Sequence, residues 1–330
     1  MALEPLDVVG IGNAIVDVIA PADDAFLAAH GMTKGAMILV DERRAQAVYA
    51  QMASAIISSG GSAGNTIAGI ASLGGKTGYI GKVRDDEFGD AFRHDITAAG
   101  TIFRTPPASS GPGTAQCLVL VTPDGQRTMN TYLGACVNLV PEDIDEELIR
   151  AARCTYLEGY LYDDPSAKRA FARAAEVAHG AGRQVALSLS DALCVERHRA
   201  DFLRLVDHHV DVLFANEGEI MTLLMAPLEA SLARLRQMTQ LATVTRGARG
   251  SLVVNETSVT EIRAEAVERV VDTTGAGDLY AAGFLFGLSR GATLAQCGRL
   301  GSLAAAEAIG HYGARPQTPL HRLVDGVLVS

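Results

Sequence analysis

The stretch VVDTTGAGDLYAAGFLFGL, residues 270 to 288, decides the fold. Strand-like β-branched residues lead into the turn DTTGAGD, residues 272–278, and an apolar helix of small residues follows. Small residues at such a turn let a phosphate approach the backbone, while the first N–H groups and the dipole of the helix supply positive potential. The stretch therefore predicts an anion-binding site where a strand turns into a helix.

Asp278 stands at the edge of this predicted anion site. A carboxylate there could accept the proton of an attacking hydroxyl during phosphoryl transfer. The alternative is that Asp278 only satisfies the N–H groups of the helix N-terminus, as acidic residues commonly do. This stretch alone leaves both interpretations open.

Composition limits the classes of protein to which the chain can belong. Its 330 residues are 48% hydrophobic, enough to bury one large α/β core or two domains. The net charge of −10 is a poor match to a polyanion, so we expect no nucleic-acid partner. No run of 18 apolar residues occurs and MALEPLD is no signal peptide, so we expect a cytoplasmic chain without a membrane partner. Five scattered cysteines without a CxxC pair indicate reduced thiols.

Strand and helix patterns alternate along nearly the whole chain. Strands are expected at 6–12, 14–20, 35–40, 77–83, 114–121, 127–133, 154–159, 184–189, 211–215, 241–246, 251–255 and 258–264. Helices are expected at 42–56, 62–73, 87–98, 142–152, 166–180, 195–206, 216–224, 228–238, 276–289 and 293–309. This alternation predicts an α/β fold with a mainly parallel sheet, helices on both faces, and ligands at the carboxyl ends of the strands.

Two regions, 14–40 and 114–133, break the alternation because their consecutive strands lack a crossover helix. The second region contains Pro123-Asp124-Gly125, a sequence typical of a tight turn. We expect the two regions to form a small β lid over the binding cleft. The large α/β domain that binds ATP and substrate would then comprise 1–13, 41–113 and 134–330.

The first strand belongs to VVGIGNAIVD, residues 8 to 17, which begins like a dinucleotide-binding motif. Ile15 occupies the position where that motif needs a third small residue, and the residues after Gly12 continue a strand rather than start a helix. We therefore expect a small molecule near Asn13 and Asp17; the alternative is a glycine-kinked strand with two turn residues. An NAD-dependent oxidoreductase is the weakest interpretation, because only the two glycines support it.

Two other clusters hold polar residues where strands turn into helices. SGGSAGNT, residues 59–66, could form a phosphate cradle, a capped turn or a contact with a polar ligand, and Asn65 suits hydrogen bonding to hydroxyls. NEGE, residues 216–219, predicts a helix cap, although one carboxylate could instead order the water shell of Mg²⁺. LGGKTGY, residues 73–79, lacks the spacing of a P-loop and indicates a helix stop.

Together these motifs make the chain resemble the ribokinase-like (PfkB) family of carbohydrate and nucleoside kinases. DTTGAGDLYAAGF matches the C-terminal signature of the family and GGSAGNTIAGIASLGG the N-terminal one, while Asn216-x-x-Glu219 and VTRGARG, residues 244–250, match further elements. The resemblance covers the whole chain. It implies a three-layer α/β/α fold with a small β-sheet lid, ATP and Mg²⁺ as cofactors, and phosphoryl transfer to an alcohol group.

The resemblance also assigns catalytic roles by position. Asp278 would be the base that takes the proton from a substrate hydroxyl. The transferring γ-phosphoryl group would be stabilised by the backbone N–H groups of Gly275, Ala276 and Gly277. Glu219, together with Asn216, would act on Mg²⁺ through water.

Binding roles follow from the same resemblance. Thr245 and Gly247 would lie along ATP, while Asp272 and Thr274 match positions that bind a monovalent cation such as K⁺ in many members. The hydroxyl groups of the substrate would be bound by Gly12, Asn13, Asp17, Gly61 and Asn65.

The first-strand spacing and YLEGYL, residues 156–161, look closest to the adenosine kinase branch of the family. Tyr160 would stack on a purine there, or else be a core aromatic, and Arg127 could reach the transferred phosphate or be a solvated strand residue. The expected substrate is the 5′-hydroxyl of adenosine or a related nucleoside. Alternatives are a kinase for ribose, fructose or 2-keto-3-deoxygluconate, and, in another class, a non-catalytic nucleotide or sugar sensor. A monomer and a homodimer both remain open.

Overall fold

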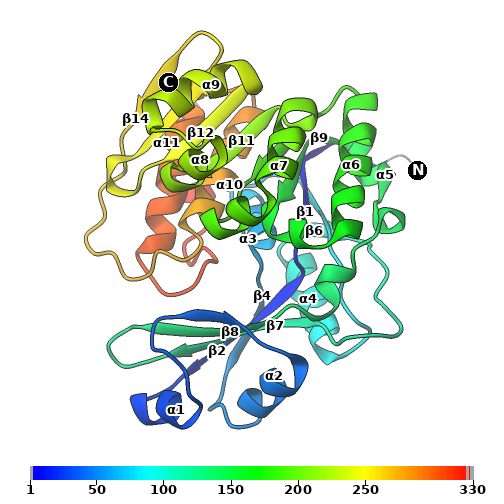
Figure 1. The fold of residues 1–330 in the computed structure, drawn as a ribbon, viewed down its shortest axis with the longest axis vertical. Coiled ribbons are helices and arrows are strands. Elements are labelled where there is room, and N and C mark those ends of the chain that lie inside the picture. The colour runs from blue at the N-terminus through cyan, green and yellow to red at the C-terminus, as the bar shows by residue number, and fades with distance from the viewer. Residues whose placement is uncertain (1–2, 325–326, 328–330) are drawn as a thin grey trace.

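The computed structural model describes residues 3–324 and 327, which form a large sheet covered by helices and a second, smaller sheet (Figure 1). The large sheet has the strand order β14-β13-β12-β11-β10-β9-β1-β5-β6. Neighbours from β12 to β6 pair in parallel, and β13 and β14 are antiparallel. Its strands are β1 (Leu6–Ile11), β5 (Thr77–Ile80), β6 (Thr101–Phe103), β9 (Ala152–Glu158), β10 (Gln184–Ser188), β11 (Val212–Asn216), β12 (Leu241–Thr245), β13 (Ser251–Asn255) and β14 (Val259–Ile262).

Helices cover both faces of the large sheet. They are α3 (Ser62–Ser72), α4 (Glu87–Ala98), α5 (Glu146–Ala151), α6 (Pro165–Gly180), α7 (Ala192–His209), α8 (Glu217–Leu224), α9 (Leu228–Met238), α10 (Ala276–Ser289) and α11 (Leu294–Ile309). Two further helices, α1 (Asp24–Ala29) and α2 (Glu42–Tyr49), lie beside the smaller sheet (Figure 1). Successive side chains of a strand point to opposite faces, so Val8 and Val9 of β1 enter two separate hydrophobic clusters. The first includes residues of α3, α10 and α11, the second residues of α5 to α9.

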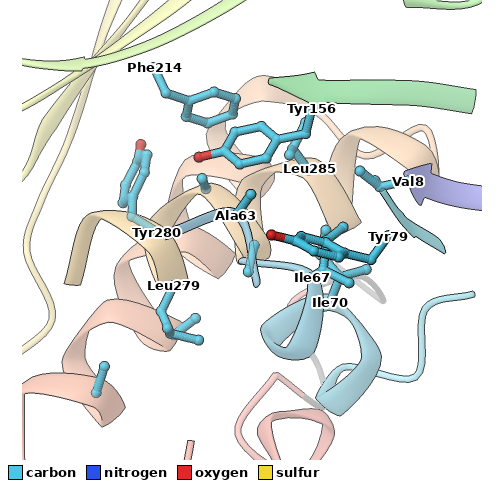
Figure 2. Close-up of a cluster of buried hydrophobic side chains, with 14 of the residues drawn as sticks. Val8, Ala63, Ile67, Ile70, Tyr79, Tyr156, Phe214, Leu279, Tyr280 and Leu285 are labelled. Carbon is cyan, nitrogen blue, oxygen red and sulfur yellow. The ribbon is translucent and has the colours of Figure 1, made fainter. Parts of the chain in front are cut away.

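The first of these clusters carries the helices that matter for the site. In Figure 2, Ile67 and Ile70 of α3 and Leu279 of α10 lie in one apolar layer with Val8 of β1. A Cβ on Gly69 would lie 2.7 Å from the Cβ of Ala282, so α3 and α10 pack closer together than side chains on both would allow. This close packing brings the N-terminal ends of the two helices together.

The smaller sheet has the strand order β3-β8-β7-β2-β4 and lies below the large sheet in Figure 1. Its strands are β2 (Ile15–Pro21), β3 (Met37–Leu39), β4 (Ile56–Ser59), β7 (Ala115–Val121) and β8 (Arg127–Tyr132). Four of them come from the two regions where we expected a lid, and β4 joins them from a third segment. The expected α/β fold with a second small sheet is confirmed, whereas its division into two domains remains a prediction.

The structure corrects two expected elements and adds two strands that we did not expect. The helix expected at 42–56 ends at Tyr49, and its last residue begins β4. Both β4 and β6 were missed because strands of four and three residues are too short to show a period, and their partners lie far away in sequence. The strand-like residues 269–271 form no strand, since the chain there leads directly into the turn before α10.

The chain crosses between the two sheets several times. At two places a glycine lets two of these crossing segments lie close together. Gly61 has φ +81°, and a Cβ there would lie 2.2 Å from the carbonyl oxygen of Asn13. Gly134 has φ +47°, and a Cβ there would lie 2.1 Å from the carbonyl oxygen of Gly113. A side chain would be strained at both positions and would push the two crossings apart.

The contact between α10 and α11 gives a test of this packing. Replacing Gly283 with alanine would put a methyl group 2.3 Å from the carbonyl oxygen of Leu300, so the helices must separate. We expect Gly283→Ala to lower the free energy of unfolding by about 1–3 kcal/mol, as overpacking does, measured by urea denaturation.

Gly180→Ala is the matched control, because Gly180 ends α6 and no atom lies within 4 Å of its added Cβ. Alanine should be neutral or slightly stabilising there. Equal unfolding free energies for the two variants would contradict the close approach of α10 and α11.

Candidate functional site

A cavity of about 710 Å³ lies between the carboxyl ends of the large-sheet strands and the inner face of the small sheet. Asn13 follows β1, Glu158 ends β9 and Asn216 ends β11, while Asp17 and Arg127 come from the small sheet. The carboxyl edge of a parallel sheet is where such folds bind ligands. The position of the cavity is therefore the one that the alternation of strands and helices predicted.

Most residues that we expected in the site line this one cavity. They are Asn13, Asp17, Gly61, Asn65, Arg127, Tyr160, Asn216, Glu219, Thr245, Thr274, Gly275, Gly277 and Asp278. Four expected residues do not line it, namely Gly12, Gly247, Asp272 and Ala276. The sequence motifs, more than 200 residues apart along the chain, thus converge on a single space.

Asp278, in the first turn of α10, is held by two residues of α3. Its Oδ1 accepts a hydrogen bond of 2.6 Å from Ser62 Oγ, and its Oδ2 accepts one of 2.9 Å from Asn65 Nδ2. Burial raises the pKa of Asp278 above its ordinary value, although these bonds and the charge of Arg315 oppose the rise. A carboxylate with a raised pKa and a fixed orientation is suited to accept a proton.

The start of α10 provides the predicted space for an anion. Gly275 is the N-cap with φ +79°, and no side chain caps the helix. A Cβ at Gly275 would lie 2.4 Å from the Cβ of Ala314, whereas one at Gly277 would meet no atom within 4 Å. Gly277 therefore leaves its face of the turn open, at the place where we predicted the anion site.

Asp17, on β2, lies beside the junction of β4 and α3. A Cβ at Gly60 would lie 2.5 Å from the carboxylate of Asp17, so only glycine fits there. Burial raises the pKa of Asp17 to about 6, Arg315 and Arg127 lower it, and Asp278 raises it. Asp17 thus presents a carboxylate that can hydrogen-bond to ligand hydroxyls in either protonation state.

Arg315 was not expected in the site. It hydrogen-bonds to the segment before α3 and to the first turn of that helix. Its guanidinium donates to the carbonyl oxygen of Ser59 at 2.8 and 3.0 Å, to Ser59 Oγ at 2.7 Å and to the carbonyl oxygen of Gly64 at 3.0 Å. Arg315 comes from a C-terminal loop without a recognisable motif, so nothing in the sequence indicated this contact.

Glu158 is a second buried group that we did not predict, although it lies in the stretch that contains Tyr160. Its Oε1 accepts from Asn13 Nδ2 at 2.7 Å and its Oε2 accepts from the backbone N–H of Ala63 at 2.8 Å. A Cβ at Gly12 would lie 2.4 Å from Glu158 Oε2, so Gly12 leaves room for this carboxylate rather than contacting the cavity. Burial raises the pKa of Glu158 to about 7.

Glu219 and Asn216 form a capping box at the start of α8. Asn216 Oδ1 accepts from the Glu219 N–H at 2.9 Å, and Glu219 Oε2 accepts from the Asn216 N–H at 2.9 Å. Burial raises the pKa of Glu219 to about 7. Glu219 therefore caps the helix, and it also lines the cavity.

The carboxylate of Glu219 fits a magnesium ion that binds together with a phosphate group, rather than a metal ion held by the protein alone. Within residues 3–324 and 327, no three His, Cys, Asp or Glu side chains gather into a metal-binding group. Mg²⁺ that binds phosphates keeps several waters and needs only one or two carboxylates. Glu219 alone is sufficient for such contact through water.

The small sheet gives the cavity an apolar roof. The apolar side chains of this roof are Ile15, Met37, Leu39, Val119, Met129 and Leu133, while Asp17 and Arg127 of the same sheet also line the cavity. Met37 and Leu39 are 50% and 60% exposed, so this roof is open to an incoming flat, apolar group. Tyr160 lines the cavity too, and its hydroxyl donates to the carbonyl oxygen of Ser190 at 3.3 Å. It is thus not buried in the core.

Arg127 reaches from β8 toward the turn before α10 and forms an ion pair with Asp272. Both side chains are 8% exposed, so Arg127 is no solvated strand residue. Asp272 also accepts hydrogen bonds from the N–H groups of Thr274 at 2.9 Å and Gly313 at 3.1 Å. Asp272 lies under the anion site and joins it to the small sheet.

Residues 24–320 match the model of the pfkB family of carbohydrate kinases. The chain belongs to this family. As a pfkB kinase it is a phosphotransferase with an alcohol group as acceptor, and the family implies the use of ATP and Mg²⁺. The resemblance read from the sequence is confirmed.

The chain is similar to proteins named as adenosine kinases and to a protein named as a probable sugar kinase. The adenosine kinase of Sinorhizobium meliloti is 49% identical, with a TM-score of 0.88 over 96% of this chain and 98% of that one. A probable sugar kinase of Rhizobium etli is 45% identical, with a TM-score of 0.90 over 98% of each chain. The adenosine kinase of Saccharomyces cerevisiae is 28% identical over 95% of this pfkB chain and 97% of its own length. The first two of these relatives are solved structures, and they confirm the ribokinase-like fold.

Among the helices that the structure describes, none combines the length and the apolar character that a membrane span needs.

The pKa of Glu158 predicts how the stability of this kinase depends on pH. Because its pKa is about 7 in the folded state and near 4.3 in an unfolded chain, the buried carboxyl stabilises the fold at low pH and loses this contribution as pH rises through 7. A glutamine there does not titrate. We expect the free energy by which Glu158→Gln destabilises the protein to be smaller at about pH 8.5 than at about pH 5.5.

Urea unfolding of both proteins at the two pH values measures this difference. Glu229→Gln, at an exposed position on α9, serves as the control and should show no such trend. An equal destabilisation by Glu158→Gln at the two pH values would mean that Glu158 is ionised in the folded protein throughout this range.

Proposed function

We propose that this pfkB kinase transfers the γ-phosphoryl group of ATP to the 5′-hydroxyl of adenosine or a related nucleoside. The observation that carries the proposal is the division of the cavity into a polar floor and an apolar roof. Asn13, Asp17 and Asn65 suit the hydroxyl groups of a ribose, while Met37 and Leu39 suit a flat base. The similarity to the S. meliloti adenosine kinase supports the same substrate.

Two polar atoms of the floor support a ligand rich in hydroxyl groups. Among the described residues, the Oδ1 atoms of Asn13 and Asn65 are buried without a hydrogen-bond partner. Unpaired buried acceptors are costly, and hydroxyl donors of a ligand would satisfy them. Tyr160 at the side of the cavity would then stack on the base.

The chemistry needs only positioning, one base and charge stabilisation. In the proposed reaction Asp278 accepts the proton of the 5′-hydroxyl, with Ser62 and Asn65 holding its two oxygens. The hydroxyl oxygen attacks the γ-phosphorus, ADP leaves, and the proton stays on Asp278. The N–H groups of the turn that contains Gly275 and Gly277 stabilise the charge on the transferring group.

The nucleotide would lie along the edge formed by β11 and β12. Asn216 and Thr245 line the cavity there, and Glu219 would contact the water shell of the Mg²⁺ that ATP carries, which neutralises phosphate charge when bound. Gly247 lies outside the cavity lining, in a short helical turn after β12, so its contact with ATP remains a proposal for the bound state.

A sugar kinase is the second candidate, because the R. etli relative bears that name. The cavity offers less for a sugar acid such as 2-keto-3-deoxygluconate. Two of its lining residues are arginines, and both are paired with carboxylates, Arg127 with Asp272 and Arg197 with Asp163. Ribose or fructose would use the polar floor but leave the apolar roof uncovered.

The role of Asp278 has a direct test. Loss of a general base typically slows a reaction by about 10²–10⁴-fold, so we expect Asp278→Asn to lower kcat by this factor while ATP and nucleoside still bind. Coupled measurement of ADP release gives kcat, and calorimetry gives binding. Asp90→Asn, at an exposed position of α4, is the control and should turn over normally. Near-normal turnover of Asp278→Asn would remove this residue from the mechanism.

The raised pKa of Asp278 also predicts the acidic limb of the pH profile. A base must be deprotonated to work, so kcat/KM should fall as pH drops through a pKa above the ordinary value for aspartate. The measurement is kcat/KM from about pH 5 to pH 8 at saturating MgATP. A value of kcat/KM that stays constant down to about pH 5 would contradict a base whose pKa is raised by burial.

The substrate is settled by one panel of ADP-release assays. Adenosine, inosine, guanosine, ribose, fructose and 2-keto-3-deoxygluconate are compared at equal concentration. Preference for adenosine is the expected result, and preference for a free sugar would support the second candidate and replace the nucleoside. No turnover with any of them would favour a non-catalytic sensor on this fold.

A further inference from the structure

The turn before α10 depends on a buried negative charge that must be compensated. Asp272 is 8% exposed and begins the turn whose N–H groups face the anion space. An uncompensated carboxylate at this position would be costly and would repel the phosphate that the turn is built to bind. The resemblance to the family implied a monovalent cation at this position.

In this chain the lone pairs of Asp272 are already in use. A carboxylate offers about four acceptor positions. The N–H of Thr274 and its hydroxyl hydrogen-bond to the carboxylate, the N–H of Gly313 donates to Oδ2, and the guanidinium of Arg127 pairs with Oδ2. These four contacts occupy the carboxylate without a metal ion.

We propose that the guanidinium of Arg127 takes the place of a monovalent cation at Asp272, so that this protein neither binds nor needs K⁺ at that position. The guanidinium carries the same charge as K⁺ and keeps it at every physiological pH. A cation at the same carboxylate would also lie beside this positive charge and be repelled by it. Asp272 and Thr274 therefore do not fit the expected cation site.

The source of this charge distinguishes it from a dissolved ion. Arg127 belongs to β8 of the small sheet. The hairpin turn before it lies against the C-terminal loop that contains Tyr312 and Gly313. A Cβ at Gly125 would lie 2.3 Å from Tyr312 Oη, and the next residue, Gly313, donates to Asp272. The positive charge at Asp272 is therefore supplied by a residue of the small sheet. Arg127 is thus a positioning residue for the anion site.

The test compares cations at constant ionic strength. Thermal unfolding is followed in K⁺, Na⁺ and N-methylglucamine, and we expect the native protein to melt at the same temperature in all three. Stabilisation by K⁺ that Asp272→Asn abolishes would overturn the proposal. This readout needs no turnover, so its result stands even if the proposed substrate is wrong.

Variants at Arg127 test whether it replaces the cation. Arg127→Met should melt about 2 °C or more higher in K⁺ than in N-methylglucamine, because the emptied place can then hold the ion. Arg127→Lys retains the charge and should stay insensitive to the cation. A folded Arg127→Met protein that responds to K⁺ no more than the native one would overturn the proposal. Arg43→Met removes an exposed charge from α2 and is the control.

Activity supplies an independent arm, which rests on the proposed kinase reaction. Native kcat should be equal in the three salts, whereas Arg127→Met should lose about 10²-fold in N-methylglucamine and regain part of it in K⁺. Recovery by K⁺ separates charge replacement from a purely structural loss, which no cation would repair. Native activity that requires K⁺ would overturn the proposal.

Discussion

Two hydrogen bonds to Asp278 join the N-terminal ends of two helices, and the rest of the site is arranged around this junction. Ser62 and Asn65 extend from α3, and Asp278 lies in the first turn of α10. The junction exists only because Gly69 lets the two helices approach on one face of the sheet. Two helix dipoles therefore point into one space, and acidic groups there lie in a positive field.

Burial and this field act against each other on the carboxyl groups of the cavity. Burial raises the pKa of Asp17, Glu158, Glu219 and Asp278, while arginines oppose the rise at Asp17 and Asp278 and hydrogen bonds oppose it at Glu158 and Glu219. Arg315 lowers the pKa of both Asp17 and Asp278. Raised pKa values concentrated in one cleft are typical of a site that handles protons.

Strand and helix periods, together with short glycine-rich motifs, were enough to predict most strands of the large sheet and many of the polar residues that line the cavity. Asp278 and the turn before it were found because their chemistry depends on local spacing. Glu158 and Arg315 were missed because their importance comes from partners 95 and 256 residues away, which no local pattern records. The short edge strand β4 was missed for the same reason, since its pairing with β2 is a tertiary contact.

The two glycine contacts between the sheets have a consequence for how this protein can vary. Gly61 and Gly134 each hold a pair of chain crossings together at one point, and two points define a line. A rigid small sheet can rotate about this line more easily than it can slide past it. Side chains far from the line, such as Met37 and Leu39, then change the width of the cavity most. Substrate range should therefore diverge in related chains through the outer strands of the small sheet, while the polar floor stays the same.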